Sequence, residues 1–153
     1  MNDLPNTNDI TNDTANRNDL PDMNDITNTD RESVLQAAND LVTAFGSHDT
    51  DRYFGSFAPN ATMLFHNVDR LLMSVDEYRQ EWASWESVGF HVQSCVSRDQ
   101  HVQLLGEVAI VTHRVATTVS DDDGLQDSDE RETIVFRRSD NRWLVVHEHL
   151  SVG

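Results

Sequence analysis

The strongest constraint on the fold is a change of hydrophobic period along the chain. Apolar residues recur at helical spacing within residues 34–45 and 75–86. From about residue 90 onward, apolar and polar residues mostly alternate, as they do in strands that are buried on one face. Ser139, Asp140 and Asn141 separate the last two of these segments and predict the turn of a hairpin. Helices followed by an antiparallel meander predict an α+β domain.

Local start and stop signals set the expected bounds of the elements. The first helix is expected to begin at Thr29 or Asp30, either of which can cap it, and to end at Gly46. A short helix is expected over about residues 49–57 and a third over residues 75–86. Strands are expected over residues 62–67, 71–74, 90–98, 101–105, 108–120, 132–138 and 143–152.

The segment before the first helix has the composition of a tail. Residues 2–12 (NDLPNTNDITN) and 18–28 (NDLPDMNDITN) form an internal repeat that is poor in apolar residues. Two such copies cannot bury a core between them, so we predict a disordered acidic tail over residues 1–29 and one folded domain over residues 30–153. A cation-binding array of Asp and Asn oxygens is the alternative, although the repeat lacks the glycine turn and terminal glutamate of a calcium loop.

The charge balance excludes several partners. All eleven basic residues are arginine, against 27 acidic residues, for a formal net charge of −16. Such acidity suits a salt-rich cytoplasm, where a Debye length of roughly 3 Å at molar salt screens self-repulsion. A high-GC genome is the alternative origin of the missing lysines. Without a basic surface, neither nucleic acid nor an anionic membrane is an expected partner.

Three further compositional features concern localisation, the acidic surface and the single cysteine. No apolar run approaches the ~20 residues of a membrane span, so we expect a soluble cytoplasmic protein. Five aspartates between residues 121 and 129 predict a solvated loop. The single cysteine, Cys95, is expected to be a small buried apolar residue.

Strand parity sorts the candidate functional residues near the C-terminus. On the last predicted strand His147 and His149 share one face, while Glu148 and Leu150 share the other. Two histidines on one face, with His66 as a third, are a pattern of metal ligands, but nothing indicates an open coordination position. We therefore expect His147 and His149 at a sheet face or subunit contact, and we expect no metal and no cofactor.

An arginine in the middle of an apolar strand needs a partner. Arg114 lies within residues 108–120, and Glu132 and Glu148 are its candidate partners. Two interpretations stay open: a buried Arg–Glu pair that fixes strand packing, or an arginine that binds an anion or orients a substrate in a pocket. The sequence has no glycine-rich phosphate loop, no Gly-x-Ser-x-Gly elbow and no paired CxxC motif.

The final hairpin carries a family resemblance. Its strands are ETIVFRR and WLVVHEHLS, at residues 132–138 and 143–151. The Trp-x-x-Val-His-x-His-x-Ser core resembles the end of the association domain of calcium/calmodulin-dependent protein kinases. It also resembles SnoaL-like proteins of the nuclear-transport-factor-2-like superfamily. The resemblance extends to SFAPNAT at residues 56–62 and to the Tyr78–Trp85 segment, and it covers about residues 31–153.

The resemblance implies a cone-shaped, cystatin-like α+β fold. In it a curved antiparallel sheet wraps three helices of the N-terminal half around a pocket, and subunits associate through the sheet as a homodimer. Pocket arginines of the kinase association domain bind small carboxylates. Only Arg114 falls on such a position, and the other two correspond to Ile134 and Leu150, which implies a more apolar pocket. The expected ligand-binding residues are Arg114, Glu132, Ile134, Phe136, Tyr78, Trp82 and Leu150, with Val146 also turned inward.

Three functions stay open. The leading one is a stand-alone domain that binds a small, mostly apolar molecule, oriented by Arg114, and dimerises. The second is an isomerase or cyclase that resembles ketosteroid isomerase or polyketide cyclases and uses Glu148 or His66 as its base, with Arg114 polarising a carbonyl. The isomerase's general-base aspartate falls at Phe65 here, so that mechanism does not transfer directly. The third is a purely oligomeric scaffold. Kinase motifs are absent, so kinase activity is not expected.

Overall fold

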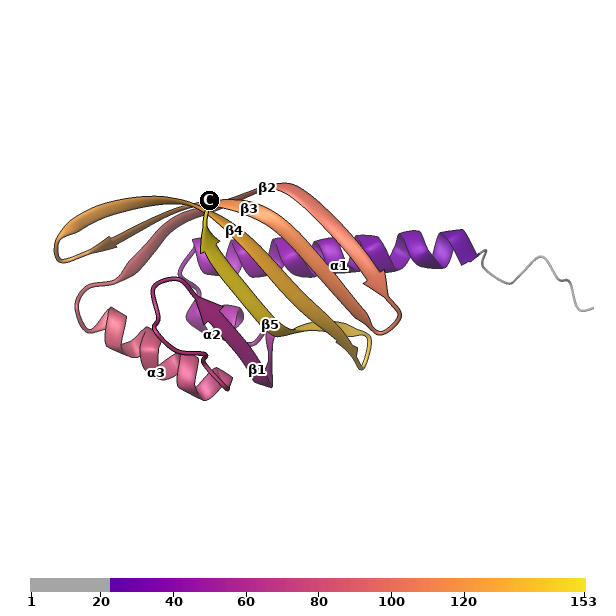
Figure 1. Ribbon diagram of the computed structural model, residues 1–153, viewed down its shortest axis with the longest axis horizontal. Helices are drawn as coiled ribbons and strands as arrows, with labels where there is room; N and C mark the ends of the chain where they lie inside the picture. Colours follow the sequence, from indigo (N-terminus) through magenta and orange to yellow (C-terminus); the bar gives the residue numbers. More distant parts are fainter. Residues whose placement is uncertain (1–22) are drawn as a thin grey trace, which may run out of the picture.

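A computed structural model describes residues 23–153, with side chains from residue 27 onward (Figure 1). Residues 1–22, which hold most of the predicted tail, lie outside the described residues. The elements, in order, are α1 (Met23–Gly46), α2 (Thr50–Phe54), β1 (Phe57–Phe65), α3 (Val75–Glu86), β2 (His91–Leu105), β3 (Val108–Asp121), β4 (Gly124–Ser139) and β5 (Arg142–Val152).

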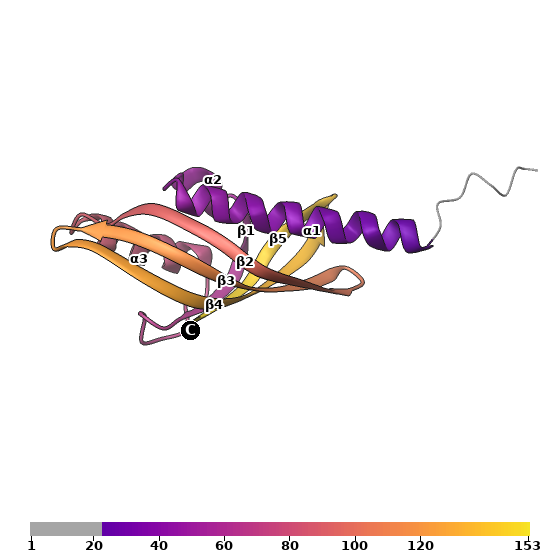
Figure 2. The ribbon, with the colours of Figure 1, turned by 90° about the horizontal axis from the view of Figure 1, so that it is seen from above.

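The five strands form one curved sheet in the order β1-β5-β4-β3-β2. Neighbouring strands are antiparallel, except that the edge strand β1 runs parallel to β5. Helix α1 lies along one face of the sheet, and α2 and α3 gather towards one end of it (Figures 1 and 2). This arrangement confirms the α+β class and the curved sheet with its helices in the N-terminal half.

The core lies between α1 and the sheet. Val34, Ala38, Leu41 and Ala44 recur at helical spacing on α1 and are buried, as an amphipathic helix requires. Aromatic side chains from α2, β1 and α3 complete the core: Tyr53, Phe54, Phe57, Phe65, Tyr78 and Trp82. Polar contacts also tie α1 to the sheet, since Arg31 Nη1 donates to the Val102 carbonyl at 2.8 Å and Arg138 pairs with Asp30.

Local signals located several elements well. Helix α3 has the expected bounds, and Ser74 caps it by accepting a hydrogen bond from the Glu77 amide. The hairpin turn between β4 and β5 places Asp140 and Asn141 at φ values of 46° and 64°, the left-handed conformation that tight hairpin turns need. Helix α1 begins at Met23, inside the segment expected to be a tail.

The strands of the first half differ more from expectation. Pro59 lies inside β1 instead of ending α2, which an edge strand tolerates. The strand expected over residues 71–74 is a single bridge between Met63 and Leu72. The two strands expected over residues 90–105 are one, β2, with a bulge in which Asp99 has a φ of 56°.

The acidic segment at residues 121–129 is not a loop. Asp121 pairs with Gly124 across a tight turn, and β4 continues from there antiparallel to the whole of β3. Asp127 and Asp129 are therefore strand residues, and Asp127 accepts a hydrogen bond of 2.6 Å from the Thr118 hydroxyl. Pairing along the full length of β3 outweighs the low strand propensity of aspartate.

A bulge in β5 changes which residues face the helices. Phe136 pairs with Val145, and the preceding residue of β4 pairs with His147, so Val146 is the extra residue. Val145 is fully buried on the helix side, and Glu148 returns to that side after the bulge. Val146 does not belong to the core cluster, which corrects the expectation that it points inward.

No helix within residues 23–153 is both long enough and apolar enough to cross a membrane.

Candidate functional site

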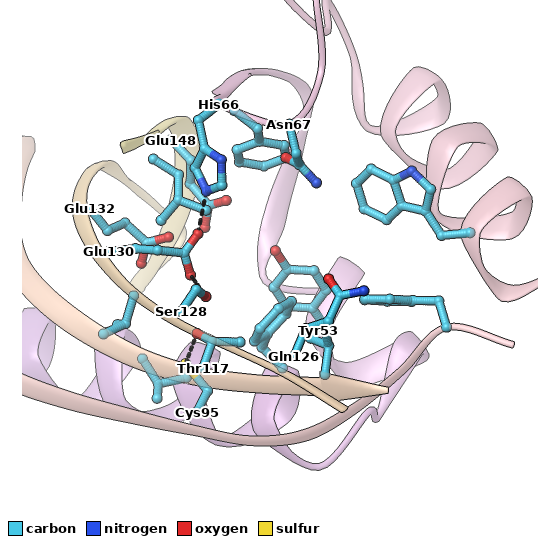
Figure 3. A pocket seen from close by; sticks show the side chains of 18 of the residues that line it. Tyr53, His66, Asn67, Cys95, Thr117, Gln126, Ser128, Glu130, Glu132 and Glu148 are labelled. Carbon is cyan, nitrogen blue, oxygen red and sulfur yellow. Dashed lines mark hydrogen bonds and ion pairs between the residues drawn. The ribbon is translucent and has the colours of Figure 1, made fainter. Parts of the chain in front are cut away.

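A cavity of about 260 Å³ lies between the helices and the inner face of the sheet (Figure 3). Every helix and strand of the described chain contributes at least one side chain to its wall. The side chains that line it are Leu41, Val42, Phe45, Tyr53, Phe65, His66, Asn67, Tyr78, Trp85, Phe90, Cys95, Val115, Thr117, Val119, Gln126, Asp127, Ser128, Glu130, Glu132, Glu148 and Leu150.

The lining is divided between apolar and acidic side chains. Apolar and aromatic residues come from the helices and from β3, while four carboxyl groups come from β4 and β5, namely Asp127, Glu130, Glu132 and Glu148. Figure 3 shows the three glutamates on one side of the cavity and Tyr53 across from them. A mostly apolar pocket with a few convergent polar groups is the usual form of a small-molecule site.

Glu130 forms an acid/base pair with His66. His66 Nε2 lies 2.6 Å from Glu130 Oε2, and the Ser128 hydroxyl donates to Glu130 Oε1 at 3.0 Å. Only 7% of the Glu130 side chain is exposed, against 32% for His66. His66 reaches the cavity because β1 ends at Phe65, so the alternation of the strand no longer sets its direction.

Glu132 on β4 is held by a series of side-chain contacts that runs across the neighbouring strands β3 and β2. Its Oε1 lies 2.7 Å from Nε2 of His113, whose side chain is fully buried. His113 Nδ1 in turn lies 2.6 Å from the Ser97 hydroxyl on β2. These contacts fix one oxygen of the carboxyl group of Glu132, a residue that lines the cavity.

Glu148 is the most deeply buried acid of the site. Its relative exposure is 2%, and no hydrogen bond or ion pair from residues 27–153 reaches its carboxyl group. Burial, and secondarily the nearby Glu132 carboxylate, raises the pKa of Glu148 well above its ordinary value. This shift favours the protonated carboxyl group, which is a proton donor, whereas the sequence alone pointed to Glu148 as a base.

Two tyrosines and a cysteine complete the polar lining. The Tyr53 and Tyr78 hydroxyls are 2.9 Å apart, and burial together with the charge of Glu148 raises the pKa of both phenols. Burial raises the pKa of the Cys95 thiol to about 11, which makes it a poor nucleophile at neutral pH. These three residues supply neutral hydrogen-bonding groups.

The structure brings together five of the residues expected to form the site: His66, Tyr78, Glu132, Glu148 and Leu150. Trp82, Ile134 and Phe136 are buried in the core and do not line the cavity. They support its walls from behind.

Arg114 does not reach the cavity. It lies on the outer face of β3, in register with Arg98 on one side and Arg131 on the other, and 37% of its side chain is exposed. Its nearest carboxylate is Asp129, at 3.9 Å. His113 and its alternate neighbours on β3 occupy the inner face instead. The structure thus corrects the expectation that Arg114 pairs with Glu132 or Glu148, or orients a ligand.

His147 and His149 also lie on the outer side of the sheet, away from the cavity lining. His147 Nδ1 is 2.8 Å from the Thr62 hydroxyl of the edge strand. Burial and the neighbouring His149 lower the pKa of His147, so it is neutral at neutral pH. No group of three His, Cys, Asp or Glu side chains in the described part of the chain has the geometry of a metal site.

Sequence reasoning missed several polar residues that line the cavity, and it also missed His113, which contacts Glu132. Glu130 and Ser128 share the parity of Glu132 along β4, a signal that the loop assignment of residues 121–129 concealed. His113 shares the parity of buried valines on β3, and Tyr53 lies on a helix too short to show periodicity.

Comparison with known proteins identifies relatives of the fold. The family model of the SnoaL-like domain matches residues 34–153. A protein of unknown function from Mycobacterium tuberculosis is similar over 86% of this chain and 76% of its own, at 12% identity and a TM-score of 0.72. No curated protein matches the sequence.

Two further solved structures of this fold come from proteins with different described roles. The association domain of CaMKII from C. elegans is 18% identical, covering 84% of this chain and 99% of that domain, with a TM-score of 0.66. A proposed dehydratase of the NTF2-like family from Streptomyces avermitilis is 20% identical, covering 82% and 98%, with a TM-score of 0.68. At these identities the likeness is one of fold.

Proposed function

This chain belongs to the SnoaL-like domain family, and we propose that it binds a small, mostly apolar molecule in the cavity between its helices and its sheet. The observation that carries the proposal is the cavity itself, about 260 Å³ in volume and lined mainly by apolar and aromatic side chains. A domain that served only as a scaffold would gain stability by filling such a space. The polar end of the molecule would meet the glutamates of β4 and β5.

A cavity-filling substitution tests ligand binding. Val119 lines the cavity, so Val119→Trp should block it, whereas Leu125→Trp places the same side chain at a hairpin tip where Leu125 is 72% exposed. We expect some members of a metabolite library to raise the melting temperature of the wild-type protein and of Leu125→Trp, but not of Val119→Trp. If no compound shifts the wild-type protein, or if Val119→Trp responds equally, the proposal is wrong.

A second function, proton transfer next to a carbonyl, is favoured by one specific observation. The cavity holds a hydrogen-bonded His66–Glu130 pair and, separately, Glu148, whose pKa is raised by burial. The pair could accept a proton from the carbon beside a carbonyl while Glu148 donates a proton to the carbonyl oxygen, which forms an enol. With a β,γ-unsaturated carbonyl compound, the His66–Glu130 pair would return the proton to the γ-carbon while the enol gives its O–H proton back to Glu148, which completes an isomerisation.

Variants separate this enzyme from a binding protein. If the domain is an enzyme, His66→Ala and Glu130→Gln should each reduce turnover of a responsive carbonyl compound by roughly 10²- to 10⁴-fold. His101→Ala is the matched control, because His101 is exposed on β2 and lies outside the cavity lining. Turnover that survives both cavity substitutions would exclude this mechanism.

Dimerisation through the outer face of the sheet also remains a proposal. Its support is that solved association and hub domains share the fold and that His147 and His149 lie on this face. Sedimentation of the purified protein, compared with that of His149→Asp, tests it, and an unchanged monomer in both would refute it.

A further inference from the structure

We propose that the molecule bound in the cavity carries a positive charge, as a protonated amine or quaternary ammonium group seated beside Glu132 and Glu148. The inference deepens the proposed binding function and depends on it. It follows from three features of the cavity: the sign of its charged groups, the acceptor atoms that have no partner, and the aromatic rings across from them.

The charged groups of the lining have one sign. Four carboxyl side chains line the cavity, and no arginine does among the described residues, while the sequence contains no lysine. His66 is the one lining residue that can become cationic, and Glu130 already pairs with it. An anionic ligand would therefore enter a site with no cation to receive it, at a high cost in a poorly solvated cavity.

The unpartnered acceptors are concentrated at Glu132 and Glu148. Glu130 has both oxygens engaged, by His66 and Ser128. Glu132 uses one oxygen for His113, and in residues 27–153 nothing donates to the other. Glu148, at 2% exposure, has neither oxygen hydrogen-bonded by a described residue. Acceptor atoms left open on the wall of a poorly solvated cavity favour a ligand that donates hydrogen bonds to them.

The opposite wall suits the rest of such a ligand. The aromatic side chains that line the cavity include Phe45, Tyr53, Tyr78, Trp85 and Phe90. Figure 3 shows Tyr53 across from the glutamates. Aromatic rings attract cations through their electron-rich faces and also bury apolar substituents. Carboxyl groups on one side and rings on the other form the type of site that recognises organic ammonium ions.

The pH dependence of affinity distinguishes a cationic ligand from a neutral carbonyl compound, because the two ligands favour different protonation states of Glu148. A cation favours the ionised carboxylate, so its binding displaces the Glu148 proton, and affinity rises with pH below the pKa of the free protein. A carbonyl oxygen needs the protonated acid, so its affinity falls as pH rises. The other titratable groups that line the cavity with Glu148 are Asp127, Glu130, Glu132, Tyr53, Tyr78, Cys95 and His66, with His113 in contact with Glu132. Both phenols and the thiol stay neutral in this range because their pKa values are raised.

Calorimetric titration with three probes of similar size tests the inference. The probes are benzyltrimethylammonium, benzyl alcohol and benzoate, titrated from about pH 6 to about pH 8. We expect the ammonium ion to bind at least about tenfold more tightly than the alcohol, and benzoate not to bind. Affinity for the ammonium ion should rise by up to about tenfold per pH unit, with proton release visible when the buffer's ionisation enthalpy is changed.

Matched variants locate the effect. Glu148→Gln should weaken ammonium binding and abolish both the proton release and its pH dependence. Asp123→Asn makes the equivalent acid-to-amide change at the exposed hairpin tip, and this variant should bind the ammonium ion as the wild-type protein does. Should Glu148→Gln fail to fold, Glu132→Gln provides the second test and should weaken ammonium binding as well.

The outcomes separate this inference from the proposed function. Preferential binding of benzyl alcohol or benzoate, or an ammonium affinity that falls with pH, would overturn the cationic ligand while ligand binding by the cavity stands. Ammonium binding that is unchanged in Glu148→Gln and Glu132→Gln would overturn it too. Failure of every probe, together with failure of the metabolite library, would overturn both.

Discussion

Replacing the buried Glu148 by glutamine should change how the stability of the protein depends on pH. Glu148 is 2% exposed and has no hydrogen-bond partner within residues 27–153, and burial together with Glu132 raises its pKa well above 4.5. In the unfolded chain its pKa returns to the ordinary value. Between these two values the folded state binds one more proton than the unfolded state, so the free energy of unfolding falls as pH rises.

The size of the effect follows from the linkage slope. Each pH unit between the two pKa values lowers the free energy of unfolding by about 1.4 kcal/mol. An interval of two pH units above the ordinary pKa thus removes about 3 kcal/mol, a large part of the stability of a small domain. The amide of the substituted glutamine does not titrate, so the variant lacks this loss and becomes more stable relative to the wild-type protein as pH increases.

Urea denaturation at a series of pH values measures the difference directly. Subtracting the wild-type curve from that of Glu148→Gln cancels the other carboxyl groups. One of these is Asp129, whose pKa the Arg98 guanidinium lowers, so that it has the opposite dependence. Asp123→Asn serves as the control for the loss of one surface charge. Parallel wild-type and Glu148→Gln curves from about pH 5 to about pH 8 would refute the assignment of a raised pKa to Glu148.

Three further predictions concern other parts of the molecule. Ser74→Ala should lower the free energy of unfolding, measured by urea denaturation, by about 1 kcal/mol because it removes the cap of α3. Ser84→Ala within the same helix is the control and should not lower it. Equal effects of the two substitutions would contradict the capping role. Cys95 should react with iodoacetamide at about pH 8 far more slowly in the folded than in the unfolded protein. The reason is that burial raises the pKa of its thiol to about 11, so that little thiolate is present. Equal reaction rates would argue against burial of this thiol. The melting temperature should rise as the KCl concentration is raised towards about 1 M, because salt screens the repulsion within a chain of net charge −16. A melting temperature that stays constant or falls with KCl would contradict salt adaptation.

Local signals in the sequence determined the elements whose bounds depend on near neighbours. Ser74 and the helical spacing that follows it located α3, and Asp140 and Asn141 located the last hairpin, because capping and turn conformation involve only a few adjacent residues. The motif of that hairpin was also enough to identify the family, which the match over residues 34–153 confirms.

Only the tertiary structure decided which side of each strand meets the helices. Alternation showed that Arg114 and His113 lie on opposite faces of β3, but both faces carry apolar residues, and packing against the helices put His113 inside. On β5 the bulge at Val146 reversed the parity between Val145 and Glu148.

The charge constellation of the cavity also arises from contacts between distant segments. His66 and Glu130 are 64 residues apart in the chain, and the pair forms because β1 ends beside β5 while β4 extends through the acidic segment. The sequence by itself therefore determined the class of fold and some of the residues available for chemistry, among them His66, Glu132 and Glu148. The acidic character of the pocket was decided by strand register and bulges, since a shift of one residue exchanges the two faces of a strand.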